Sequence, residues 1–151
     1  MQFINELFSN TILLASFWGW LVAQLLKTIL YVIVNKNFNP ERLMGDGGMP
    51  SSHSATVMAL VTSTLMQYGA GTFEFAISGV LALIVMHDAM GVRRQAGKQA
   101  VVINNMMDWF KKMDQDIPVE QKLKEFVGHT PLQVLFGALL GILVGFVVSS
   151  I

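Results

Sequence analysis

A nine-residue stretch, residues 47–55, gathers the residue types that bind phosphate and move a proton. It reads GGMPSSHSA and directly precedes a long apolar segment. Glycines let the backbone approach a ligand closely, serine hydroxyls donate hydrogen bonds, and the amides of a helix N-terminus attract anions. His53 adds an imidazole, the side chain that most readily moves protons near neutral pH. The stretch indicates an anion site at the start of a membrane helix, although a well-capped helix alone would use the same residues.

Two further segments carry similar chemistry, residues 87–100 (HDAMGVRRQAGKQA) and residues 123–134 (LKEFVGHTPLQV). Arginine offers phosphate a planar, bidentate donor fork, and lysine offers a point charge. The alternative for Arg93 and Arg94 is simple flanking charge at a membrane boundary. The candidate phosphate-binding cations are Lys27, Lys36, Arg42, Arg93 and Arg94. A solvated or lipid-facing surface is expected for the other lysines, Lys98, Lys111, Lys112, Lys122 and Lys124.

Lys27 stands inside an apolar run, with Gln24 and Tyr31 three and four residues away on the same helix face. A charge within a membrane span is costly unless it faces a wet cavity or a partner, so its position favours function. Snorkelling of the long side chain to the interface is the alternative.

His53 and His129 are the candidate catalytic histidines, because both lie where an apolar segment begins. One imidazole can attack phosphorus while a second protonates the leaving oxygen, and the two can divide these roles. Asp88 can orient a histidine, pair with an arginine or cap the following helix. His87 fits an interfacial side chain better than a reactive one.

The composition places these residues in a membrane protein. The 151 residues are 53% hydrophobic and 13% charged, and the mean hydropathy is +0.53, too apolar for an ordinary soluble domain. The absence of cysteine excludes disulfides and thiolate catalysis, and ten basic against ten acidic residues predict no nucleic-acid partner. We expect a single membrane domain, residues 1–151, with an all-α fold of about four transmembrane helices, at residues 11–34, 54–69, 72–90 and 131–151.

Residues 91–130 form the long polar region of the chain. The first half has an amphipathic helical pattern, and a short helix is expected at residues 119–127, after a break near Pro118. With four spans, this region and the loop 35–53 lie on the same side, together with nearly all basic residues. The positive-inside rule then makes these polar loops cytoplasmic and puts both termini outside. Both candidate histidines and the candidate cations would share that side.

These segments resemble a known superfamily. The PSSH of residues 50–53 is similar to the PSGH motif of the type 2 phosphatidic acid phosphatases, a superfamily that includes membrane lipid phosphatases and vanadium haloperoxidases. A divergent branch of small bacterial and plant-plastid membrane proteins carries GGMPSSHSA, DAxGVRRxAGxQA and GHTPxEV, and this chain resembles all three in order. The resemblance implies a phosphohistidine mechanism that needs no metal or other cofactor, in a bacterial cell membrane.

Roles for individual residues follow from that resemblance. It implies that His129 is the nucleophile and His53 the general acid, with Asp88 as a further catalytic candidate. Ser51, Ser52 and their amides would cradle the phosphoryl oxygens. The first basic pair of the superfamily would correspond to Arg42 with Lys36 or Lys27, and the arginine of its third motif to Arg93 or Arg94.

The chain departs from the parent pattern beside the nucleophile. Gln133 stands four residues after His129, where the parent superfamily has aspartate. An amide can hold the imidazole through its oxygen but cannot stabilise its cation as a carboxylate does. Asp88 or Glu125 would then have to substitute.

The expected function is a membrane phosphatase for a phospholipid or polyprenyl phosphate or diphosphate, with lipid phosphate and membrane lipids as partners. The alternatives are a non-catalytic protein that binds or moves phosphorylated lipids, and a structural membrane subunit. Gly137, Gly141 and Gly145 lie on one helix face and predict a packing surface, for an internal contact or a homodimer.

Overall fold

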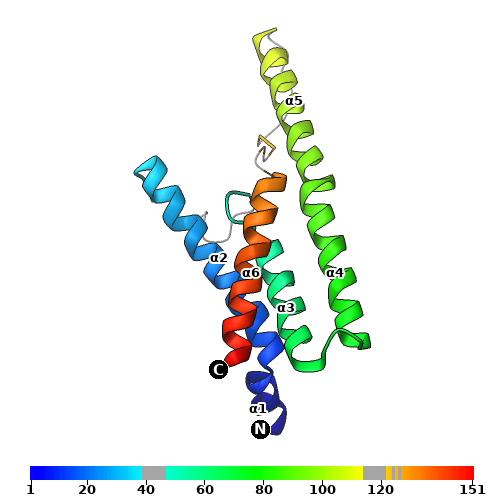
Figure 1. Cartoon of the computed structure of the whole chain (residues 1–151). Helices are drawn as coiled ribbons and strands as arrows, with labels where there is room; N and C mark the ends of the chain where they lie inside the picture. The colour runs from blue at the N-terminus through cyan, green and yellow to red at the C-terminus, as the bar shows by residue number, and fades with distance from the viewer. Residues whose placement is uncertain (39–46, 114–121, 124, 126) are drawn as a thin grey trace.

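The computed structural model describes residues 1–38, 47–113, 122–123, 125 and 127–151. This part of the chain contains no strand, which confirms the predicted all-α class. Its helices are α1 (Gln2–Ser9), α2 (Thr11–Asn35), α3 (Ser52–Tyr68), α4 (Phe73–Met90), α5 (Val92–Lys112) and α6 (Pro131–Ser150) (Figure 1). The N-terminal residues form a helix of their own instead of extending the first span, because the backbone of Asn10 is extended and its side chain caps α2.

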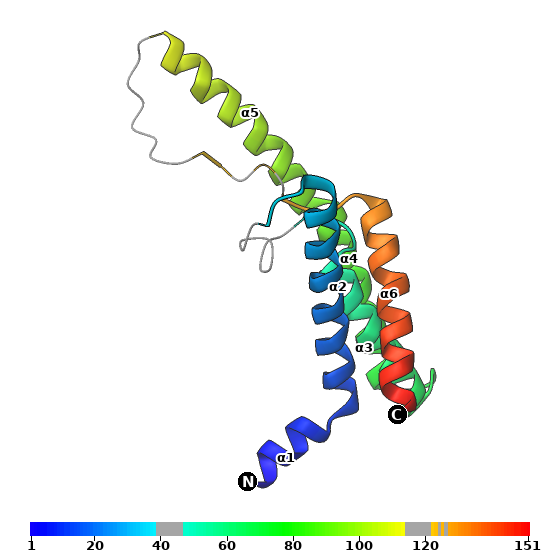
Figure 2. The ribbon, with the colours of Figure 1, turned by 90° about the vertical axis from the view of Figure 1, so that its left-hand side faces the viewer.

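Helix α3 is the centre of the bundle and packs against α2, α4 and α6. Both chain termini lie at one end of the bundle, whereas α3 and α6 begin at the other, where α2 and α4 end (Figures 1 and 2). The three motifs therefore share one end, as predicted. We call it the motif end. The cytoplasmic placement of that end stays a prediction.

Three helical stretches are long and apolar enough to cross a membrane, namely α2, the continuous stretch Phe73–Lys112 and α6. Helix α3 has only 17 residues, the lower limit for a span. It nevertheless runs alongside the others, so the predicted count of four spans is approximate.

The interior and exterior of the bundle have the composition of a membrane protein. The buried side chains are mostly small or polar, such as Ala15, Ala55, Ser54 and Ser63, while large apolar residues of α2, α4 and α6 are exposed. Without water around them, membrane helices gain by close packing of small residues and not by burying leucine. The exposed surface is therefore suited to lipid.

The predicted glycine face packs inside the molecule, on α3. A Cβ on Gly145 would lie 2.8 Å from the carbonyl oxygen of Ala59, and one on Gly141 or Gly137 would clash with the carbonyl oxygens of Ala55 and Ser51. From α2, Gly19 makes the same kind of approach to Ala55. The α3 backbone is thus held between two glycine surfaces.

Helix α5 continues beyond the bundle at the motif end after a bend at Gly91 (Figure 2). Residues 122, 123, 125, 127 and 128 lie between α5 and α6 in the chain, and we call them the return segment. The helix expected at residues 119–127 is absent from its described residues, while 119–121, 124 and 126 lie outside the description. The helix prediction is wrong for residues 122, 123, 125 and 127, and the backbone of residues 123, 125 and 127 lies against α5 instead.

Gly141→Leu should destabilise the bundle by about 3 kcal/mol, since overpacking forces the two backbones apart. The measurement is thermal unfolding in detergent. Gly79→Leu is the matched control, because an added Cβ there meets no atom within 4 Å. Equal melting temperatures for the two variants would contradict the α3–α6 packing.

Candidate functional site

The three motifs converge on a pocket of about 260 Å³ at the motif end. We call it the motif pocket. Gly47 and Gly48 contribute one wall, the first two turns of α5 a second, and the return segment with the start of α6 a third. The side chains that can donate to an anion there are Arg94, Lys98, His129, Thr130 and Gln133. Segments far apart in the sequence thus form one site, as their shared membrane side predicts.

His129 and His53 lie next to each other. Their ring centroids are 5.8 Å apart and the ring planes are inclined by 63°. His129 is 2% exposed, and its backbone N–H donates to the carbonyl oxygen of Ala89 at 2.9 Å, which fixes the entrance to α6 against the end of α4. His129 lines the motif pocket, and His53 lines a second pocket. The histidine pair therefore links two cavities.

The second pocket, of about 210 Å³, lies over α3 between α2 and α4. We call it the lateral pocket. Its lining is Trp20, Gln24, Ser52, His53, Thr56, Val57 and Val85. Lys27 lies behind Gln24 and adds to the polarity of this side of the pocket. Nζ of this buried lysine donates to Gln24 Oε1 at 2.5 Å and to Ser52 Oγ at 3.5 Å.

The glycines of the first motif make room for that lysine. Gly47 and Gly48 have φ values of +85° and +89°, which other residues adopt only with strain. A Cβ on Gly48 would be 3.2 Å from Cγ of Lys27. The backbone can therefore cover the aliphatic part of Lys27, which lies inside the protein and not at a snorkelling position.

Ser51 and Ser52 take different positions at the start of α3. The backbone N–H of Ser51 donates to the carbonyl oxygen of Gln133, and its hydroxyl accepts from the N–H and the hydroxyl of Ser54. Ser51 is thus engaged in capping α3 and joining it to α6. The hydroxyl of Ser52 faces Lys27 and the lateral pocket.

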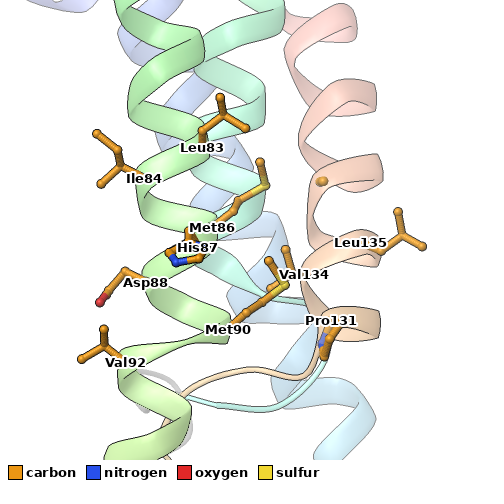
Figure 3. A pocket seen from close by; sticks show the side chains of 11 residues that line it. Leu83, Ile84, Met86, His87, Asp88, Met90, Val92, Pro131, Val134 and Leu135 are labelled. Atoms are coloured by element: carbon orange, nitrogen blue, oxygen red, sulfur yellow. The ribbon is translucent and has the colours of Figure 1, made fainter.

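The two arginines of the second motif diverge. Arg94 lines the motif pocket, whereas Nε of Arg93 donates to Oδ2 of Asp88 at 2.8 Å. Figure 3 shows Asp88 pointing away from α6, beside an apolar groove of about 780 Å³ between α4 and α6. Lys36 is exposed at the end of α2, and Arg42 lies outside the described residues.

Lys98, expected among the surface lysines, lines the motif pocket from the same helix as Arg94. Its position four residues after Arg94 could have revealed it, because that spacing puts both side chains on one helix face.

Close backbone packing holds the return segment against α5. A Cβ on Gly97 would lie 2.6 Å from the carbonyl oxygen of Glu125, and Gly128, with φ +87°, lies against the backbone of Arg94. The buried amide of Asn104 bonds both the N–H and the C=O of Leu123 at 2.9 Å, and donates to Glu125 Oε1 at 2.8 Å. Lys122 also donates to Asp108, which raises the pKa of Lys122 above its ordinary value.

The acids and amide considered as partners for His129 bond elsewhere. Oε1 of Gln133 accepts from the backbone N–H of Thr130 at 2.9 Å and completes a capping box for α6. Glu125 accepts from Asn104 and Asp88 from Arg93. Nor do three histidine or acidic side chains gather into a metal site anywhere in the residues that the structure describes.

Asn104→Leu should free the return segment, since each buried polar group left without a partner costs about 1–3 kcal/mol. Hydrogen exchange at the Leu123 amide should then accelerate roughly tenfold or more. Asn105→Leu, at an exposed neighbouring position, should leave that rate unchanged. The same exchange rate in both variants would show that Asn104 does not hold the segment.

Comparisons with known proteins identify the family of the chain. The family model described as "Divergent PAP2 family" matches residues 8–144. The "Uncharacterized membrane protein YuiD" of Bacillus subtilis (strain 168) is 40% identical, over 95% of this chain and 97% of that protein. No solved structure matches this chain. The family model covers the helical bundle and all three motifs, so this membrane protein belongs to the divergent PAP2 family.

Proposed function

We propose that the protein is a membrane phosphatase that hydrolyses a lipid phosphate or diphosphate through a phosphohistidine intermediate. The observation that carries the proposal is the His53–His129 pair, with ring centroids 5.8 Å apart, beside a pocket that also holds Arg94 and Lys98. Two adjacent imidazoles and two cations supply a nucleophile, a proton donor and charge stabilisation for a phosphoryl group.

In the first step a ring nitrogen of His129 attacks phosphorus, and a P–N bond forms as the P–O bond to the alcohol breaks. His53 gives its proton to the leaving oxygen. In the second step water attacks phosphorus and passes a proton to His53, the P–N bond breaks, and inorganic phosphate leaves. Arg94 and Lys98 bind the phosphoryl oxygens from the motif pocket, while Lys27 and Ser52 lie on the leaving-group side.

Family membership and burial support this division of roles. His129 is 2% exposed at the wall of the motif pocket, where water is limited and charge interactions are stronger than in bulk solvent. The half-buried His53 lines the other cavity. A phosphoryl group held at His129 would thus have its leaving oxygen directed toward His53.

Binding of phosphorylated lipids without hydrolysis is the second candidate. The hydrogen bonds of Gln133, Glu125 and Asp88 favour it, because these bonds engage the three side chains in capping α6, holding Asn104 and pairing with Arg93. A cation on an imidazole gains much from a carboxylate partner.

The two histidines should respond differently to the leaving group. His53→Gln should slow hydrolysis of an alkyl phosphate about 100-fold or more, the usual contribution of a general acid. It should slow p-nitrophenyl phosphate far less, because p-nitrophenolate leaves without a proton. His129→Gln should abolish both reactions. Steady-state kinetics of the purified protein in detergent, without added metal, provides the measurement.

His87→Gln is the matched control, since this exposed histidine faces the groove between α4 and α6. Equal background rates for wild type and all three variants would reject the phosphatase. Lipid-phosphate binding that persists in that case and falls in Arg94→Ala would establish the binding function instead.

A further inference from the structure

We infer that the lateral pocket receives the alcohol side of the substrate, and that this alcohol carries a single apolar chain. The inference rests on the proposed function and adds to it the class of leaving group. It starts from the position of His53, the proposed proton donor, which lines the lateral pocket and not the motif pocket. The oxygen that His53 protonates belongs to the leaving alcohol, so the atoms attached to that oxygen must lie on the same side.

The lining of the lateral pocket matches an amphiphile. Gln24, Ser52, His53 and Thr56 are polar, and Gln24 and Ser52 accept hydrogen bonds from Nζ of Lys27. Trp20, Val57 and Val85 provide apolar contacts from three different helices. A phosphate ester of an apolar alcohol has the same succession from polar to apolar groups.

The arrangement of the helices gives the chain a way out. Helices α2 and α4 both pack on α3 but do not contact each other in the described part of the chain. The pocket lies between these two helices, so the gap between them is the route by which an apolar chain would reach the hydrocarbon tails of the membrane. Beyond the first few carbons, a long chain would lie among the surrounding lipids.

The size of the lateral pocket points to one chain. Its volume is about 210 Å³, the share of about seven water molecules in the liquid. That space holds the first carbons of one alkyl or prenyl chain, whereas a glycerol backbone with its two ester groups and the first carbons of both acyl chains needs more room. The wider groove between α4 and α6 is not lined by His53 or His129 (Figure 3), so it serves as the internal comparison.

Filling one cavity at a time tests the inference. Val85→Phe narrows the lateral pocket, and Ile84→Phe, one residue earlier on α4, narrows the other groove. Val85→Phe should raise the KM for dodecyl phosphate about tenfold or more and leave the KM for ethyl phosphate unchanged. Ile84→Phe should change neither. The opposite pattern, or equal effects of Val85→Phe on both esters, would overturn the inference while leaving the phosphatase intact.

A binding measurement separates the inference from catalysis. In the protein with Trp18→Phe and Trp109→Phe, Trp20 is the remaining tryptophan. Dodecyl phosphate with bromine on its third and fourth carbons should quench Trp20 fluorescence saturably, and Val85→Phe should weaken this quenching about tenfold or more. Equal quenching by the brominated alcohol without phosphate would overturn the inference. Saturable quenching in a protein that hydrolyses no phosphate would support the pocket and reject the phosphatase.

Comparison of dodecyl phosphate with dioleoyl phosphatidic acid tests the single chain. Wild-type protein should favour the single-chain ester in kcat/KM and in competition with the brominated probe. A preference for the diacyl lipid in both measurements would overturn this part of the inference.

Discussion

The close approach of α3 and α6 is the constraint on which the site depends. Gly137, Gly141 and Gly145 let the two backbones meet along several turns. The contact ends where the backbone N–H of Ser51 donates to the carbonyl oxygen of Gln133. His53 comes shortly after Ser51 in the chain, and His129 comes shortly before Gln133. The packing of α3 on α6 therefore sets the distance between the two imidazoles. A side chain at any of the three glycines would move one histidine away from the other.

The same packing gives the bundle a polar interior. Burying a lysine within a membrane span costs about 3 kcal/mol on insertion scales, and hydrogen bonds from Lys27 to Gln24 and Ser52 offset part of that cost. The buried lysine, the serines of α3 and the histidine pair form one polar column inside a shell of large apolar side chains. Within it, the histidine pair joins the motif pocket to the lateral pocket.

Much of this could be predicted from the sequence because the relevant patterns are local. Apolar length located the helices, and the spacing by four of the glycines showed a packing face. The choice between internal packing and a dimer contact needed the structure, because any smooth partner fits such a face. Which of Arg93 and Arg94 lines the motif pocket also depends on a tertiary contact, the one between Gly128 and the α5 backbone. The presence of glutamine at position 133 also has a local explanation, because Thr130 and Gln133 have the spacing of a capping box.

Helix α3 is short, and its hydroxyl groups are covered mainly by α2 and α6. The chain is synthesised from its N-terminus, so α3 leaves the ribosome before α6, its most extensive partner, exists. During synthesis, the weakly apolar α3 must therefore stay in or beside the insertion machinery until α6 has been made. The highly apolar α6 enters lipid readily by itself and completes the fold by enclosing α3. The helix that carries the first motif thus gains its full set of packing contacts only once α6 has been synthesised.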